Sequence, residues 1–197
     1  MGYAQQRTAY KVTTAPASEP ISTADAKTYL NVSTSLHDTL IANLVSAART
    51  LYENYTGTAV ITQTITQTWD LTPDCAEFEL AVNPVTAVVV SYKDANGTYQ
   101  TWDASNYTLD TISPLARVVK NTASSWPTTG DFIAKWKIVI TAGYASAAAV
   151  PEDIISAILL MVGFLYENRE DIPINDTANH KIRSFAAVAF GRRMQLI

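Results

Sequence analysis

The sequence predicts an α+β fold, in which N- and C-terminal helices form a helical bundle and an antiparallel β block is inserted between them. Three observations lead to this class. Apolar residues recur every three or four positions between residues 36 and 55, strand-forming residues alternate after Gly57, and a long apolar helix follows Pro151. Helices with apolar stripes bury them against one another, and a β insertion keeps the connections short.

The composition indicates a folded chain with a substantial core. Of its 197 residues, 48% are hydrophobic and 16% are charged, and the net charge is −4. This apolar content is not typical of disordered chains. The acidic balance is not typical of proteins that bind nucleic acid by neutralising phosphates. The single cysteine, Cys75, cannot form an intramolecular disulfide, so we expect synthesis in a reducing cytoplasm.

Composition and periodicity divide the chain into four parts. We expect an extended N-terminal arm (1–18), a helical core (19–57 and 151–190), an inserted β subdomain (58–150) and a C-terminal tail (191–197). The arm shows neither helical nor strand periodicity, so its order requires a partner.

Two helices are expected in the N-terminal part of the core. Ser22, with Asp25 three residues later, forms a start that resembles a capping box, and this short helix ends before Asn31. A second start at Ser35 and Asp38 opens a longer amphipathic helix. Gly57 is its expected C-cap, because glycine readily adopts the left-handed conformation.

The β block contains several strand candidates, at residues 60–71, 77–82, 87–94, 98–103 with 107–109, 116–120 and 136–141. In the first candidate, threonines at every second position define one polar face, which can stay in contact with water. Asn96-Gly97 predicts a β-hairpin with a type I′ turn, which requires positive φ at both residues.

The segment 151–171 predicts a helix that is apolar almost all the way round. Pro151 and the acidic residues Glu152 and Asp153 mark its N-terminus. Such a helix buries both sides, inside a domain, in a membrane or between subunits. Its apolar part spans only about a dozen residues, too short for a bilayer. We therefore expect contacts between copies of the chain; the residues predicted to pack there are Ile155, Leu159, Gly163 and Tyr166. A last helix is expected from about residue 175.

Motifs for catalysis or cofactor binding are not found in the sequence. His37 and His180 lack the spacing of metal ligands, and Cys75 has no cationic neighbour to activate it. We predict no cofactor and no metal, and an enzyme is the weakest interpretation. The dense Trp and Tyr residues of the β block leave an alternative open, a β-rich module that binds carbohydrate or peptide on surface rings, although core packing is the commoner use of such rings.

Several short segments, in order, resemble the head–tail connector or adaptor proteins of tailed bacteriophages. They include ISTADAKTYL from Ile21, YTG ending at Gly57, TQT from Thr62, VPE from Val150 and YENRE from Tyr166. The resemblance spans about residues 21–190. It implies a structural virion protein at the head–tail interface, which forms a ring of twelve copies on the portal, extends the DNA channel and provides a platform for the next head-completion or tail protein. DNA would pass through without specific binding, and no membrane is involved.

The resemblance also implies a portal-binding role for the C-terminal segment. From Thr177 to the end the chain has basic residues, no acidic ones and an apolar close. The expected portal-binding residues are Lys181, Arg183, Arg192, Arg193, Leu196 and Ile197. Such a segment can be steered by charge and then bury its apolar end.

Overall fold

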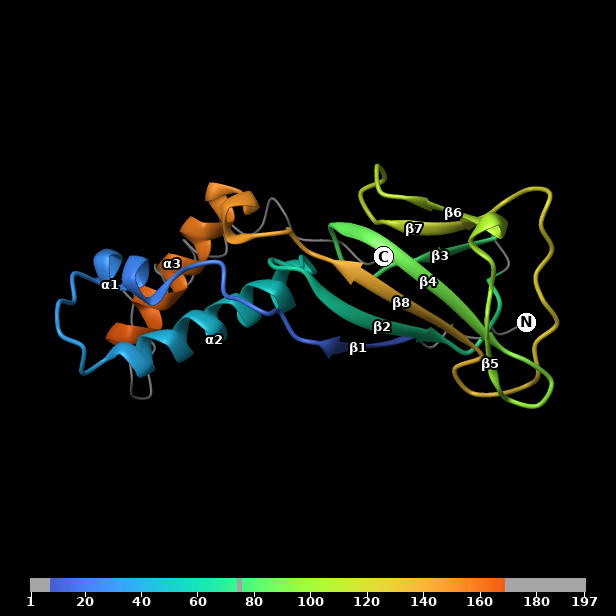
Figure 1. Ribbon diagram of the computed structural model, residues 1–197, viewed down its shortest axis with the longest axis horizontal. Coiled ribbons are helices and arrows are strands. Elements are labelled where there is room, and N and C mark those ends of the chain that lie inside the picture. Colours follow the sequence, from blue (N-terminus) through green and yellow to red (C-terminus); the bar gives the residue numbers. More distant parts are fainter. Residues whose placement is uncertain (1–7, 74–75, 169–197) are drawn as a thin grey trace, which may run out of the picture. The chain divides into compact units, whose positions relative to one another are not determined.

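The computed structural model describes residues 8–73 and 76–168. The chain divides into two compact units (Figure 1). The β unit comprises Met1–Ala15 and Gln63–Gly143, and the helical unit comprises Pro16–Thr62 and Tyr144–Ile197. The predicted α+β class is confirmed, because N- and C-terminal helices pack together and the segment between them forms antiparallel sheets.

The helical unit contains α1 (Thr23–Leu30), α2 (Asp38–Thr56) and α3 (Glu152–Glu167). The predicted cap of α1 is confirmed, because the Ser22 hydroxyl oxygen accepts a hydrogen bond from the Asp25 N–H at 3.1 Å. Gly57, with φ of 72°, ends α2 as expected. The predicted start of α2 at Ser35 is too early. His37 occupies the N-cap position, and Ser35 contributes only the carbonyl that accepts from the Asp38 N–H.

The core of the helical unit lies where α1, α2 and α3 meet. Each helix contributes one apolar face to it, as expected from the spacing of apolar residues. The buried side chains come from Ile21, Ala26, Ile41, Val45, Ala48, Tyr52, Val60, Ile61, Val150, Ile154, Ala157, Ile158, Met161, Val162 and Phe164.

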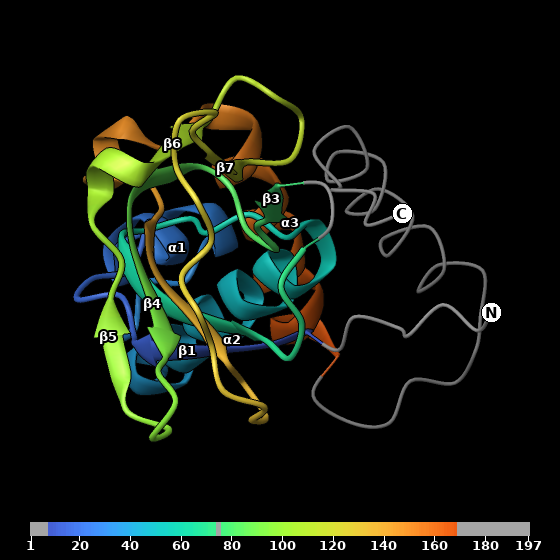
Figure 2. The same cartoon turned by 90° about the vertical axis from the view of Figure 1, so that its right-hand side faces the viewer.

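Within its described residues, the β unit forms two antiparallel sheets. The five-stranded sheet has the order β1-β2-β8-β4-β5, and the three-stranded sheet has the order β3-β7-β6. The first is built from β1 (Thr8–Thr14), β2 (Gln63–Trp69), β4 (Val85–Lys93), β5 (Tyr99–Thr101) and β8 (Trp136–Ala142). The second is built from β3 (Glu77–Glu79), β6 (Tyr107–Asp110) and β7 (Arg117–Lys120). Both sheets are visible in Figure 2.

The alternation predicted for the first strand candidate is confirmed in β2. Its odd-numbered residues, from Gln63 to Trp69, are buried, and the threonines between them are half-buried on the opposite face. The neighbouring strand β8 has the same alternation, with Trp136, Ile138 and Ile140 on the buried face. Side chains of both strands therefore build one core on one side of the sheet.

The structure corrects the sequence prediction at the N-terminus. Residues 8–14, expected to lie in an arm without strand structure, form the edge strand β1, which pairs with β2 from Thr8↔Trp69 to Thr14↔Thr64. The partner strand begins about fifty residues later, so local periodicity gave little indication of this pairing.

A second correction concerns the turn between β4 and β5. The hairpin itself is confirmed, but only Gly97 has a positive φ, of 80°. The Asp94 carboxylate accepts hydrogen bonds from the N–H groups of Asn96 and Thr98. The Gly97 N–H donates to the Asp94 carbonyl, and the Asp94 N–H donates to the Thr98 carbonyl. This pattern is that of a three-residue hairpin loop with a glycine bulge.

Candidate interaction surfaces

Helix α3 begins with two acidic residues, and one of its faces is buried in the core of the helical unit. The acidic residues Glu152 and Asp153 occupy its first turn, where negative charge is stabilised by the helix dipole. Six residues of α3 are buried against the rest of the helical unit: Ile154, Ala157, Ile158, Met161, Val162 and Phe164. Most of the apolar surface of this helix is therefore used within one chain, and a second copy is not required to cover it.

The four residues predicted to pack between copies lie on one half-buried row of α3. Ile155, Leu159, Gly163 and Tyr166 follow one another at spacings of three or four residues. Ile155, Leu159 and Tyr166 are partly buried and pack against the core of the helical unit. The Tyr166 hydroxyl lies 2.5 Å from Nδ1 of His37, and Gly163 faces the ring of Tyr29. Ile155 and Leu159 are the aliphatic side chains of this row, and each is only half-buried by its own chain.

Gly163 permits the close approach of α1 to α3. A Cβ atom at this position would lie 3.3 Å from the nearest ring carbon of Tyr29 and 4.0 Å from a methyl group of Leu30. A larger side chain would force α1 away. We expect Gly163→Leu to lower the free energy of unfolding by about 1–3 kcal/mol, as other overpacked cores do.

The matched control for this prediction is Gly163→Ala. Its single methyl group needs only a small shift of Tyr29, which is 47% exposed, and alanine is favoured over glycine in a helix by about 1 kcal/mol. Thermal unfolding followed by far-ultraviolet circular dichroism measures both variants. Equal melting temperatures for Gly163→Leu and the wild type would contradict this packing role.

A buried ion-pair cluster joins the segment before α1 to α2. Arg49 is 8% exposed and donates to Glu19 from Nε at 2.7 Å and to Glu53 from Nη1 at 2.7 Å. Glu53 also accepts the Val60 N–H at 2.8 Å. Burial raises the pKa of Glu53 above its usual value, although the Val60 hydrogen bond and the charge of Arg49 act in the opposite direction. This cluster leaves no local signal in the sequence, because Glu19 and Arg49 lie thirty positions apart.

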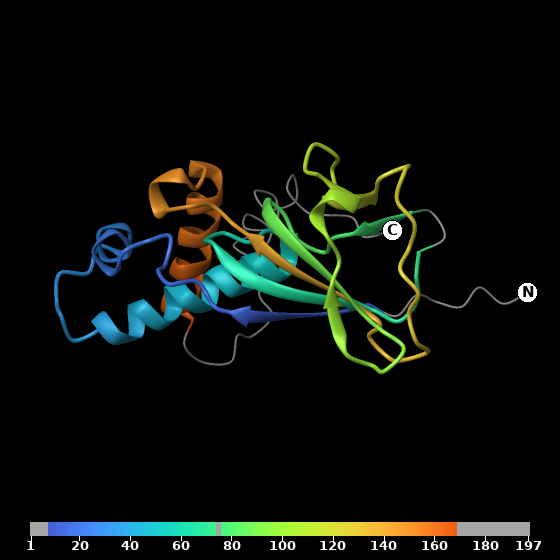
Figure 3. The same ribbon diagram turned by 45° about the vertical axis from the view of Figure 1, so that its right-hand side comes forward.

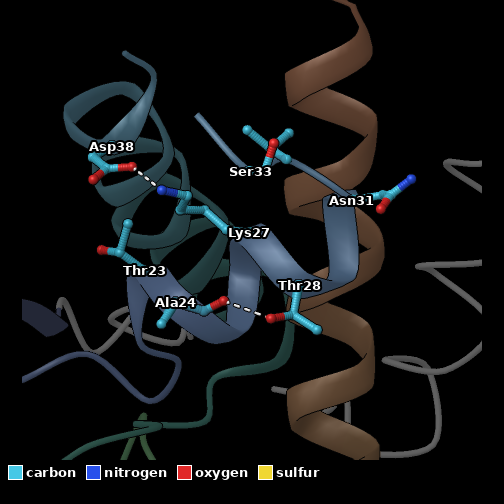
Figure 4. Close-up of a pocket in the computed structure, with 8 residues that line it drawn as sticks. Thr23, Ala24, Lys27, Thr28, Asn31, Ser33 and Asp38 are labelled. Atoms are coloured by element: carbon cyan, nitrogen blue, oxygen red, sulfur yellow. Dashed lines mark hydrogen bonds and ion pairs between the residues drawn. The ribbon is translucent and has the colours of Figure 1, made fainter. Parts of the chain in front are cut away.

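An open pocket of about 580 Å³ lies beside α1. Figure 4 shows its lining, with Lys27 and Asp38 joined across it. The Lys27 ammonium donates to the Asp38 carboxylate at 2.6 Å, which compensates the charges of both groups. The other lining residues are small or neutral: Thr23, Ala24, Thr28, Asn31, Val32 and Ser33. A charged ligand would find no unpaired ionic group among these described residues.

The tryptophans of the β unit form a core. Trp69, Trp102 and Trp136 are at most 6% exposed, and the half-buried Trp126 lies 5.0 Å from Trp136 between ring centroids. Phe78 lies within 5.5 Å of Trp69, Trp126 and Trp136. A carbohydrate- or peptide-binding module would need some of these rings at the surface. Core packing, the commoner use of such rings, therefore accounts for three of the four tryptophans.

The predicted portal-binding residues lie outside the described residues. This applies to Lys181, Arg183, Arg192, Arg193, Leu196 and Ile197, and also to His180 and Cys75.

Within the described residues, no three His, Cys, Asp or Glu side chains are grouped closely enough to hold a metal ion. Over the same residues, no helix has the length and apolar character needed to cross a membrane.

Comparison with known proteins gives no match by sequence and several by structure. No family model and no curated protein matches the chain. A chain of the virion of the native gene transfer agent (GTA) particle matches with a TM-score of 0.77 and 20% identity, over 95% of this chain and 96% of that one. Chains of the neck of the empty GTA particle, computed with C6 symmetry, and of the native particle neck, computed with C12 symmetry, each match with a TM-score of 0.77 over 96% of this chain and 97% of theirs. The chain thus has, over nearly its whole length, the fold of a chain in the GTA particle neck.

Proposed function

We propose that this chain is a structural virion protein, a head–tail connector or adaptor without catalytic activity. It forms a ring on the portal, extends the DNA channel and provides the docking platform for the next head-completion or tail protein. It would be made in the host cytoplasm and end at the head–tail interface of the particle. One observation supports this most strongly: the fold of nearly the whole chain is shared with chains of GTA particle necks.

The proposed partners are the portal ring, neighbouring copies and the next protein of the neck. The GTA necks were computed with six-fold and twelve-fold symmetry, which supports a cyclic arrangement of copies and is compatible with twelve. We propose that Ile155 and Leu159 on α3 contribute to contacts with neighbouring copies. DNA passes through without specific binding, since the net charge of −4 favours a weakly repulsive channel.

The direct test mixes purified protein with its cognate portal ring. We expect an annular complex with a fixed ratio of the two proteins, visible by electron microscopy. A portal from an unrelated phage is the control for specificity. If no complex forms with the cognate portal even when the protein is in large molar excess over the portal rings, the proposed function is wrong.

Deletion of Arg192–Ile197 should weaken the portal complex, because the deletion removes two cations and the apolar end of the tail. The double variant Arg192→Gln, Arg193→Gln separates these effects. If the arginines act by charge, its binding should approach that of the wild type at high salt, where the wild type also loses the electrostatic contribution. Binding is measured by co-sedimentation with portal rings. Undiminished binding of the truncated chain would remove the tail from the contact with the portal.

A further inference from the structure

The strand β1 leaves one edge of the five-stranded sheet open. In the order β1-β2-β8-β4-β5, the two edges are β1 and β5, and among the described strands β1 pairs only with β2. Figure 3 shows β1 lying along β2. The side chains of residues 9–15 are all exposed. An edge with exposed backbone groups can accept a further strand unless charges, prolines or bulges protect it. β1 carries one charge, Lys11, and a register shift between Val12 and Thr14, and the pairing of Thr8–Val12 with β2 is regular.

The apolar side chains of β1 lie on the face that is buried elsewhere in the sheet. Tyr10 is paired with Gln67 and Val12 with Ile65, and both partners are buried. Yet Tyr10 is 58% exposed and Val12 is 42% exposed. The core face of the sheet therefore continues onto β1, where the described residues do not cover it. This arrangement suits an additional strand whose side chains would lie beside Tyr10 and Val12.

The hydrogen-bond pattern shows which backbone groups of β1 point outward. The Trp102 N–H donates to Val90 across β5 and β4, and the Lys93 N–H donates to Lys135 across β4 and β8. In an inner strand, successive residues form backbone hydrogen bonds alternately with the strand on one side and the strand on the other. The paired residues of β4 and β8, of β8 and β2, and of β2 and β1 therefore show which residues of β1 bond to β2. The alternation assigns Ala9 and Lys11 to the pairing with β2. The N–H and C=O groups of Tyr10 and Val12 point away from the sheet.

The opposite edge offers a matching set of groups. By the same alternation, Gln100 bonds to β4, while the backbone groups of Tyr99 and Thr101 point outward from β5. Each of the four steps from β1 to β5 is antiparallel, so β1 and β5 run in the same direction. A second copy in the same orientation would present its β1 parallel to β5 of the first.

We infer that β1 of one copy pairs with β5 of the next, so that the five-stranded sheet continues from copy to copy. This inference rests on the proposed ring. A closed ring uses a heterologous contact, in which one patch of a protomer meets a different patch of its neighbour, and the two edges of this sheet are such a pair. A strand from a different protein would pair with one of the two edges and leave the other unpaired. In a ring of identical copies, each copy pairs its β1 with one neighbour and its β5 with the other. Tyr10 and Val12 would then lie beside Gln100, whose side chain is on the same face of the sheet.

Cysteine cross-linking tests this pairing. Neighbouring strands lie about 4.8 Å apart, within the range of Cα separations that a disulfide bridges. In a Cys75→Ser background, Gln100→Cys is combined with either Tyr10→Cys or Val12→Cys, to cover both registers. After oxidation of portal-bound rings, we expect a ladder of covalent oligomers. The combination of Lys11→Cys with Gln100→Cys is the matched control, because Lys11 lies on the opposite face, and it should give no ladder.

The outcomes separate this inference from the proposed function. Complete rings by electron microscopy without a ladder in either combination would overturn the strand pairing and leave the function standing. Covalent dimers from Val12→Cys alone would indicate two β1 strands facing each other, and would also overturn it. The absence of rings with the uncross-linked wild type counts against the proposed function itself.

A backbone variant gives a second readout. Val12→Pro removes an outward N–H without taking a donor from the β1–β2 pairing, and Val12→Thr keeps that N–H. We expect Val12→Pro to lose ring formation on the portal and Val12→Thr to retain it, with unchanged Trp fluorescence showing an intact β unit in both. Rings formed equally well by Val12→Pro would contradict the inference.

Discussion

Replacing Trp136 by alanine is expected to lower the free energy of unfolding of the β unit by about 3–5 kcal/mol, the range for large aromatic residues removed from a core. Trp136 is fully buried. Its ring centroid lies within 6.0 Å of those of Phe78, Tyr92, Trp102 and Trp126, and its Nε1–H donates to the Thr72 hydroxyl at 3.0 Å. The substitution removes a shared packing partner and leaves the Thr72 hydroxyl without its donor.

Denaturant unfolding followed by Trp fluorescence measures this effect. All four tryptophans of the chain lie in Gln63–Gly143, so their fluorescence reports on the β unit. Val89→Ala is the control: Val89 is in the same sheet but 49% exposed, and we expect a change of at most about 0.5 kcal/mol. If Trp136→Ala costs no more than Val89→Ala, the aromatic cluster is not the core of the unit.

Replacing Arg49 by alanine is expected to destabilise the helical unit by about 3–5 kcal/mol, because it leaves a buried carboxylate without its cation. The Glu53 side chain is only 13% exposed and cannot turn fully into water, whereas Glu19 is 32% exposed and can be rehydrated. Far-ultraviolet circular dichroism follows this unit, and the Trp fluorescence of the β unit provides an internal control. Glu53→Gln in the Arg49→Ala background should recover part of the loss, because it removes the unpaired charge.

The Arg49→Ala variant should also show a distinctive pH dependence. Burial raises the pKa of Glu53, and the loss of Arg49 removes an interaction that lowers it. A carboxyl group whose pKa is higher in the folded state binds its proton more tightly there, so stability increases as pH falls through that pKa. The difference in the free energy of unfolding between the wild type and Arg49→Ala should therefore narrow as the pH falls from neutrality towards the ordinary pKa of a glutamate. If this difference in stability does not change with pH, the unpaired charge of Glu53 is not the cause of the destabilisation.

Much of the fold could be predicted because its signals are local. The Ser22 cap, the glycine that ends α2 and the alternation of β2 each depend on residues within a few positions of one another. The pairing of β1 with β2 is not local, and its alternation of Tyr10 and Val12 with Ala9 and Lys11 is too short to stand out. The predicted turn type was wrong, although the sequence contains an indication of the correct one. An aspartate at the first position of a type I turn accepts hydrogen bonds from backbone N–H groups of the turn, as Asp94 does here.

The candidate surfaces were predicted less completely than the fold. Helical periodicity places Ile155, Leu159, Gly163 and Tyr166 on one row, and the structure shows them so. Periodicity cannot say what a row contacts, because Tyr29 and His37 reach it only through the packing of α1 and α2. The resemblance to phage connectors gave a functional hypothesis that no catalytic motif could have given.

The division of the chain has a consequence for truncation. The backbone passes between the two units at residues 15–16, 62–63 and 143–144. An ordinary insertion has two such crossings, and β1 adds the third. A protease that cuts one junction would therefore leave the halves tethered by two others. Trimming the first fifteen residues would remove a strand from the β unit, while the helices that follow directly in the sequence would keep every residue of their own core.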